Sequence, residues 1–164
     1  MQPAQQATAK STYQVQWIVW GALLLTHGIY GVVVNKVAEQ GALASWQQSP
    51  LLLPLSCVAM VTLVVTHVLP KMIFRGALRI AKNNGQNLDE KALITSSMTA
   101  NIVAWALSES ITVYGVVLGM ECRDIKPFLL FAAVGLVNML ILRPNKDRWL
   151  QVAKESGLLQ QAWK

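Results

Sequence analysis

The feature that most constrains the fold is a set of four long, continuously apolar runs in a chain of 164 residues. Each run is close to the roughly 17 to 25 residues that an α-helix needs to cross a hydrocarbon core of about 30 Å. The fourth run is the shortest, and Lys126 and Arg143 at its ends are expected to extend toward the polar interfaces. The runs predict four membrane-spanning helices at about residues 15–34, 51–69, 100–119 and 127–142.

Composition supports this interpretation. Hydrophobic residues make up 54% of the chain and charged residues 13%, whereas soluble proteins average about 25% charged residues. Strands of a transmembrane barrel alternate apolar and polar residues over segments of about ten residues, and these runs do not. We therefore predict an all-α integral membrane four-helix protein, with residues 1–164 forming a single membrane domain.

Lysines and arginines are distributed unequally between the two sides that four spans would create. The first run is expected to be a permanent span, because it is longer than a typical signal-peptide core and has no clear cleavage site. Cytoplasmic loops carry an excess of basic residues, so both termini are predicted to be cytoplasmic, in a bacterial inner membrane. One side would hold eleven basic residues and the other would hold three: Lys10, Lys71, Arg75, Arg79, Lys82, Lys91, Arg143, Lys146, Arg148, Lys154 and Lys164 against Lys36, Arg123 and Lys126.

This topology also accounts for the net charge of +6, together with attraction to the anionic headgroups of membrane lipids. Nothing in the charge pattern requires nucleic acid as a partner. A disulfide between Cys57 and Cys122 is geometrically conceivable, but two free thiols are the simpler interpretation. No cluster of side chains has the spacing of metal ligands, and the two histidines form no haem signature. Neither a metal nor a cofactor is expected.

An internal repeat relates the two halves of the chain. Residues 17–34 align with residues 101–118 at a constant offset of 84, with eight of eighteen positions identical. The second run of each half is followed by a proline, Pro70 or Pro144, and then by a basic amphipathic segment. The pattern predicts two duplicated transmembrane hairpins, each with a proline that bends the chain at the membrane surface and a basic amphipathic cytoplasmic extension.

A carboxylic acid, Glu109, lies near the middle of the third run. A charged residue at mid-bilayer costs about 2.5 to 3.5 kcal/mol on insertion scales, so this acid is expected to be protonated, paired or near water. Burial favours the neutral form of a carboxyl group. Glu109 is adjacent to a polar stripe at helical spacing, which is expected to face protein or trapped water: Asn101, Trp105, Ser108 and Thr112.

His27 is the ionisable residue of the first run. The repeat aligns it with Ile111, two residues from Glu109, so a contact between His27 and Glu109 is one interpretation. The other is that His27 bonds a backbone carbonyl on its own. His67, near the cytoplasmic end of the second run, is expected to be a snorkelling or capping residue.

Residues 106–117 resemble the carboxylate helix of the proteolipid, or c, subunits of rotary ATPases, in which a glutamate is followed by small residues and then by an apolar-Tyr-Gly-apolar run. The resemblance is confined to these residues. It implies that Glu109 carries a proton or a sodium ion, that Tyr114 and Gly115 pack around it, and that identical subunits form a ring.

Three functions are compatible with these observations. The first is a non-enzymatic homo-oligomer, ring-like and enclosing lipid or water, with buried Glu109 at a helix contact. The second is a proton- or sodium-translocating rotor or relay subunit that uses Glu109. The third is an accessory subunit of a larger membrane complex, with other membrane subunits as partners. An enzyme is not expected, because no nucleophile–base set or phosphate-binding loop is found.

Two groups of residues carry these hypotheses. The intramembrane polar contacts are predicted from the acid and its polar neighbours: Glu109, His27, Ser108, Thr112 and Tyr114. Small residues let helices approach closely within or between chains, and the predicted packing positions are Gly21, Gly28, Gly31, Gly115 and Gly135.

Overall fold

The chain is helical throughout the part that the computed structural model describes, residues 3–43, 45–85 and 90–155. These ranges contain no strand, which confirms the all-α prediction. Three helices are long and apolar enough to cross a membrane, and a bent pair of helices is a fourth candidate. This composition is compatible with an integral membrane protein. The elements are α1 (Pro3–Ala38), the 3-10 helix η1 (Trp46–Gln48), α2 (Leu52–Asn83), α3 (Glu90–Cys122), α4 (Ile125–Ile141) and α5 (Lys146–Glu155).

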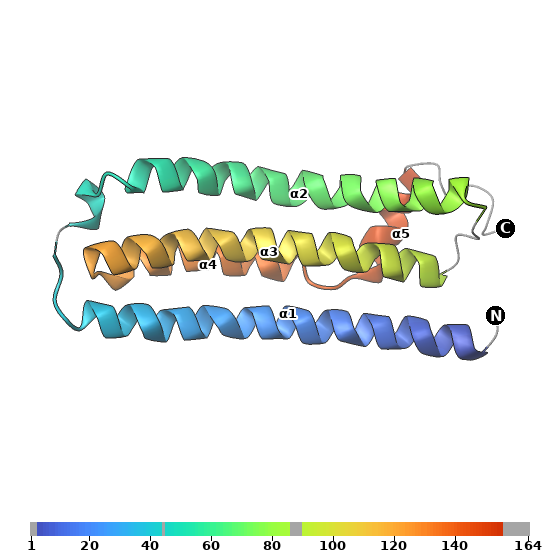
Figure 1. Ribbon diagram of the computed structural model, residues 1–164, viewed down its shortest axis with the longest axis horizontal. Helices are drawn as coiled ribbons and strands as arrows, with labels where there is room; N and C mark the ends of the chain where they lie inside the picture. The colour runs from blue at the N-terminus through green and yellow to red at the C-terminus, as the bar shows by residue number, and fades with distance from the viewer. Residues whose placement is uncertain (1–2, 44, 86–89, 156–164) are drawn as a thin grey trace.

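The third helix, α3, is the centre of the bundle. It packs against α1, α2 and α4, and α1 also contacts α4. Figure 1 shows α1, α3 and α2 side by side along the long axis, with α4 running alongside α3. Because α3 has a neighbour on three sides, four of its polar residues are buried inside the chain: Ser97, Asn101, Ser108 and Thr112.

Two glycine positions allow α3 and α4 to approach closely. A Cβ atom on Gly115 would lie 2.7 Å from the Cβ of Phe131 and 3.1 Å from the Cα of Phe128. A Cβ atom on Gly135 would overlap the Thr112 hydroxyl. Small residues at such positions let helix backbones come together, which supplies van der Waals contact that lipid tails cannot replace.

The two prolines behave differently from each other. The predicted bend at Pro70 is wrong, since α2 continues through this residue as one helix to Asn83. Prolines are tolerated in membrane helices where neighbouring helices support the backbone, and Pro70 is buried between such neighbours. The chain does bend by 72° between α4 and α5, and Pro144 lies in the connection.

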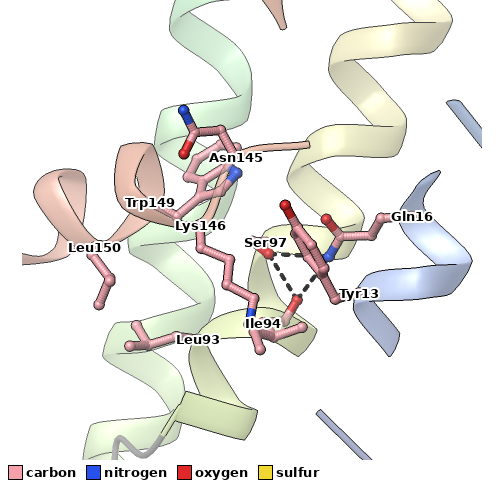
Figure 2. Close-up of a pocket in the computed structure, with 9 residues that line it drawn as sticks. All are labelled: Tyr13, Gln16, Leu93, Ile94, Ser97, Asn145, Lys146, Trp149 and Leu150. Atoms are coloured by element: carbon pink, nitrogen blue, oxygen red, sulfur yellow. Dashed lines mark hydrogen bonds between the residues drawn. The ribbon is translucent and has the colours of Figure 1, made fainter. Parts of the chain in front are cut away.

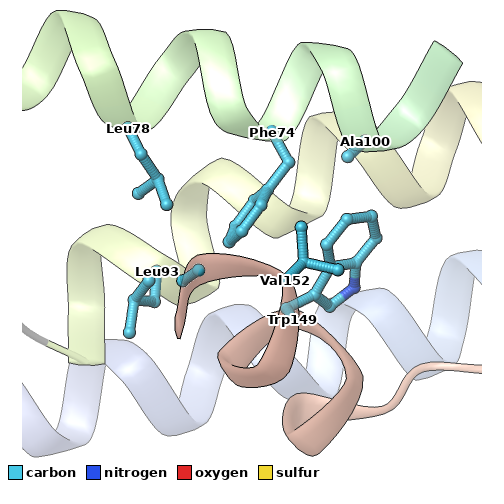
Figure 3. Close-up of a cluster of buried hydrophobic side chains, with 7 residues drawn as sticks. Phe74, Leu78, Leu93, Ala100, Trp149 and Val152 are labelled. Carbon is cyan, nitrogen blue, oxygen red and sulfur yellow. The ribbon is translucent and has the colours of Figure 1, made fainter. Parts of the chain in front are cut away.

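The short helix α5 packs against α2 and α3, as Figure 3 shows. Its Trp149 ring lies 4.7 Å from the Phe74 ring, centroid to centroid. The Trp149 indole N–H also donates a hydrogen bond of 3.0 Å to Asn101 Oδ1 on α3. The cluster joins α2, α3 and α5 and consists of Phe74, Leu78, Leu93, Ala100, Trp149, Val152 and Ala153.

Basic residues gather at this end of the molecule, where the end of α2, the start of α3 and α5 meet (Figure 1). We refer to it as the basic end. The lysines and arginines of these segments whose side chains are described are Lys71, Arg75, Arg79, Lys82, Arg143, Lys146, Arg148 and Lys154. The opposite end carries Lys36, Arg123 and Lys126.

Candidate functional site

Glu109 lies on the face of α3 that meets α1. Its Oε1 atom accepts hydrogen bonds from the Thr26 hydroxyl at 2.6 Å and from the Tyr30 hydroxyl at 3.1 Å. Thr26 and Tyr30 are four residues apart on α1 and therefore lie on the same face of that helix, one above the other. Two hydroxyls of one helix thus hold a single carboxyl group of its neighbour.

The Thr26 hydroxyl is shared between two acceptors. Its oxygen lies 2.6 Å from Glu109 Oε1 and also 2.6 Å from the Leu23 carbonyl oxygen. A hydroxyl has one hydrogen to donate, so Thr26 divides it between the acid of α3 and the backbone of its own helix.

The other carboxyl oxygen, Oε2, has no hydrogen-bond partner in the described part of the chain. Glu109 as a whole is only half-buried. Polar groups exposed to hydrocarbon have no water with which to bond, and each unsatisfied group is costly. The surface formed by α1 and α3 around Glu109 therefore carries a polar atom that needs a partner from outside the described chain.

His27 does not contact Glu109. Its Nδ1 atom lies 3.0 Å from the Leu23 carbonyl oxygen, so Nδ1–H donates to that acceptor. This is the second of the two interpretations of His27 given above. Successive helix residues are rotated by about 100°, which turns His27 away from the face shared by Thr26 and Tyr30 and into the interior of the bundle, where it is 4% exposed.

A second set of polar atoms lies in that interior, between α1, α3 and α4. Asn138 Nδ2 donates a hydrogen bond of 2.8 Å to the Ser108 hydroxyl. Three buried atoms of this set have no partner among the described residues: His27 Nε2, Thr112 Oγ1 and Asn138 Oδ1. We call His27, Ser108, Thr112 and Asn138 the interior polar cluster. Buried polar atoms without partners are uncommon in proteins.

The remaining predicted residues lie elsewhere around α3. Tyr114 faces α2, where its hydroxyl lies 3.5 Å from Thr62 Oγ1, and Gly115 faces α4. Five residues separate Glu109 from Tyr114, a rotation of about 140°. Within one chain, Tyr114 and Gly115 therefore lie on other faces of α3 than Glu109.

The packing glycines divide into two groups. Gly31 lies against the Phe128 ring, and Gly115 and Gly135 lie in the α3–α4 contact. Gly21 and Gly28 have no atom within 4 Å of an added Cβ. Gly21 and Gly28 are therefore open positions on α1.

Comparisons with protein-family models, with curated proteins and with solved structures found no match to this chain. Its function is inferred from its own geometry.

A pocket of about 210 Å³ opens at the basic end, away from Glu109 (Figure 2). Gln16 on its wall donates to Ser97 Oγ at 3.2 Å and accepts from Asn101 Nδ2 at 2.9 Å. The Lys146 ammonium group lies 4.9 Å from the centre of the Tyr13 ring, a cation–π distance. These contacts tie α1, α3 and α5 together, so we assign them a structural role.

A metal site requires several ligating side chains in one place. No group of three or more histidine, cysteine, aspartate or glutamate side chains among them could hold a metal ion. Cys57 and Cys122 are free thiols, as the simpler interpretation predicted.

Sequence reasoning missed several residues of the site. Thr26 and Tyr30 are not among the predicted site residues. Two hydroxyl side chains one helical turn apart, at the depth of an acid in another run, would have indicated them. Asn138 and Gln16 are amides within or beside apolar runs, which is a second signal.

Proposed function

We propose that this chain is a non-enzymatic membrane protein that assembles side by side with identical copies into a ring, with Glu109 at the contact between subunits. The proposal includes four spans in a bacterial inner membrane and cytoplasmic termini at the basic end. The observation that carries it is the half-buried Glu109 carboxyl, whose Oε1 atom has two donors and whose Oε2 atom has none in the described chain.

First, the Glu109 carboxyl group needs to be shielded from the lipid acyl chains. An acid at the middle of a membrane helix lies close to the bilayer centre, where exposure to lipid costs several kcal/mol per polar group. Such residues nearly always face protein or water. A neighbouring copy that packs over the α1–α3 contact would remove the carboxyl from the acyl tails.

The second step is the identity of the opposing surface. Gly28 is two residues from both Thr26 and Tyr30, a rotation of about 200°. Gly21 and Gly28 therefore lie on the side of α1 turned away from Glu109, and both are open. Open glycines one heptad apart allow close approach of another helix.

The third step is the symmetry. The Glu109 face and the Gly21–Gly28 face are different surfaces, so their contact is heterologous, and heterologous contacts produce rings when the rotation closes. Copies inserted with the same orientation are related by rotation about the membrane normal. A ring of this kind encloses a central area that lipid or water fills.

The duplication of the hairpins is also part of the proposal. The repeat places Thr26 level with Ser110, and in the structure Thr26 bonds to the residue before it, Glu109. The agreement within one residue supports an origin of α1 and α3 from one duplicated helix.

The experiment is to purify the chain alone in a mild detergent, measure its mass and image the particle. A homomeric ring is expected. Gly28→Leu should reduce assembly, and Gly76→Leu is the matched control, since Gly76 is an open glycine on α2. A chain that stays monomeric, and is assembled only with other proteins, would favour an accessory subunit of a larger complex.

A second candidate function is transport of a proton or sodium ion by Glu109. Two hydroxyl oxygens, from Thr26 and Tyr30, lie within 3.1 Å of the carboxyl oxygen, and the resemblance of residues 106–117 to proteolipid subunits points the same way. Proton flux into liposomes that contain the chain, measured with wild type and Glu109→Gln, decides this. Equal flux in both would exclude ion transport by Glu109.

A further inference from the structure

A groove runs between α2 and α4, on the side of α3 away from Glu109. It consists of three neighbouring hollows of about 240, 580 and 360 Å³. Leu63 and Val134 line both the first and the second hollow, and His67 and Ile141 line both the second and the third. The hollows are therefore continuous from the middle of the bundle to the basic end.

Most of the groove is apolar. Ile111 of α3 lies at its inner part, and side chains of α2 and α4 form its walls, among them Leu63, Val64 and Val137. Its α2 wall extends from Ser56 to Lys71, about 22 Å at 1.5 Å per residue. One leaflet of the hydrocarbon core is about 15 Å thick, so the groove is long enough for an acyl chain.

The groove ends among polar and charged side chains. His67, Lys71 and Arg148 line the last hollow together with Glu155. Glu155 accepts a hydrogen bond of 2.9 Å from Gln151, while neither Lys71 nor Arg148 forms an ion pair with a residue in the described ranges. Two cations that form no ion pair with a described residue thus stand where an apolar groove reaches the basic end, and one carboxylate, Glu155, lines the same hollow.

The position of Arg148 is restrained by packing. Its guanidinium carbon lies 5.2 Å from the centre of the Trp149 ring. Burial lowers the pKa of Arg148, because an apolar environment disfavours its charge. Arginine nevertheless stays protonated in proteins, so a partly buried guanidinium gains from a bound anion.

We propose that the groove between α2 and α4 binds one anionic phospholipid, with its phosphate between Lys71 and Arg148 and an acyl chain along Leu63, Val134 and Val137. Charge complementarity selects this occupant. A helix of a second copy is about 10 to 12 Å across and would place apolar side chains, not a phosphate, against the two cations. The site is separate from Glu109 and does not depend on subunit assembly.

The test measures lipid retained by the full-length chain. The protein is purified in detergent, incubated with phosphatidylglycerol or phosphatidylcholine, and examined by native mass spectrometry. Wild type should retain phosphatidylglycerol in preference to phosphatidylcholine. Lys71→Gln and Arg148→Gln should each lower phosphatidylglycerol retention about fivefold, the effect of one basic residue near an anionic lipid surface. Arg79→Gln changes an exposed residue of α2, the helix of Lys71, and should retain phosphatidylglycerol as well as wild type does.

A second variant tests the apolar part. Val137→Trp places a large side chain in the groove without a change of charge and should reduce retention of both lipids. Equal retention of the two lipids by wild type, or unchanged retention in Lys71→Gln and Arg148→Gln, would overturn the proposal. A lower oligomer mass for Val137→Trp with lipid retention intact would instead identify a second copy as the occupant and also overturn it.

Discussion

The Thr26 hydroxyl and the Glu109 carboxyl lie 2.6 Å apart across the contact between α1 and α3. The same hydroxyl is 2.6 Å from the Leu23 carbonyl oxygen. A hydroxyl has a single hydrogen to donate, so the two acceptors share it unless the acid itself carries a proton. The carboxyl group is kept in place by α1 through Oε1, with Oε2 still open in the described chain.

Carbodiimide labelling tests whether Glu109 is protonated. Hydrophobic carbodiimides react with protonated carboxyl groups in apolar surroundings, so Glu109 should be labelled and Glu109→Gln should lose the label. Glu121 is the internal control, since it is exposed at the end of α3 and its carboxylate already accepts a hydrogen bond from Ser49. Peptide mass spectrometry locates the label. Modification of Glu121 with Glu109 untouched would contradict a neutral Glu109.

Loss of the Thr26 hydroxyl should weaken the α1–α3 contact modestly. Polar contacts between membrane helices average about 0.6 kcal/mol, with a maximum of about 1.7 kcal/mol, and Thr26→Val should destabilise the folded chain within this range. Thr66→Val is the matched control, because in the described residues the Thr66 hydroxyl bonds to the Thr62 carbonyl oxygen of its own helix and to no other helix. Thermal unfolding in detergent compares the two. Equal losses would mean that the contact with Glu109 contributes nothing.

A methyl group at Gly135 should be destabilising. The added Cβ would overlap the Thr112 hydroxyl and lie 3.0 Å from the Ser108 carbonyl oxygen, and overpacking of this kind costs about 1 to 3 kcal/mol. Gly76→Ala meets no atom within 4 Å and should stabilise α2 by roughly 0.5 to 1 kcal/mol. Relative to wild type, Gly135→Ala should lower the unfolding temperature and Gly76→Ala should raise it. A Gly135→Ala variant as stable as wild type would show that α3 and α4 are not in close contact at this position.

Removal of the indole N–H of Trp149 should loosen α5. Trp149→Phe keeps an aromatic ring near Phe74 but leaves Asn101 Oδ1 without its donor, and an unsatisfied buried acceptor costs about 1 to 3 kcal/mol. Trypsin should then cut sooner at Arg148 or Lys154. Trp17→Phe, a change at a partly exposed indole on α1, should leave the rate unchanged. Equal cleavage rates for Trp149→Phe and Trp17→Phe would show that the Trp149–Asn101 hydrogen bond does not hold α5 in place.

The fold was largely predictable because apolar length determines it. Long apolar runs predict helices, and each expected span lies within one helix of the structure, apart from one residue at the start of the second and at the end of the fourth. The extent of α1 and α2 beyond their spans was not predictable from apolarity, because polar segments such as residues 3–14 continue a helix without a break in hydrogen bonding. The behaviour of Pro70 depends on the burial of the proline between neighbouring helices, which one sequence does not report.

The candidate site was predictable in part. Position along a helix axis follows from residue number, and the repeat aligns Glu109 with residue 25 of α1, next to its partner Thr26. Rotation about the helix axis does not follow, and a difference of one residue changes the face by about 100°. For this reason Thr26 and not His27 bonds to Glu109, and Tyr114 lies toward α2.

The most direct test of the assembly is a disulfide between two different chains. Cells would produce a Gly28→Cys chain together with a Val113→Cys chain, both with the exposed Cys57 changed to serine. Gly28 lies on the open face of α1, and Val113 is partly exposed one turn from Glu109 on the same face of α3. Disulfide-linked dimers that form only when both chains are present are the predicted result. Dimers of Gly28→Cys with itself, or no linkage in any combination, would contradict a heterologous contact at Glu109.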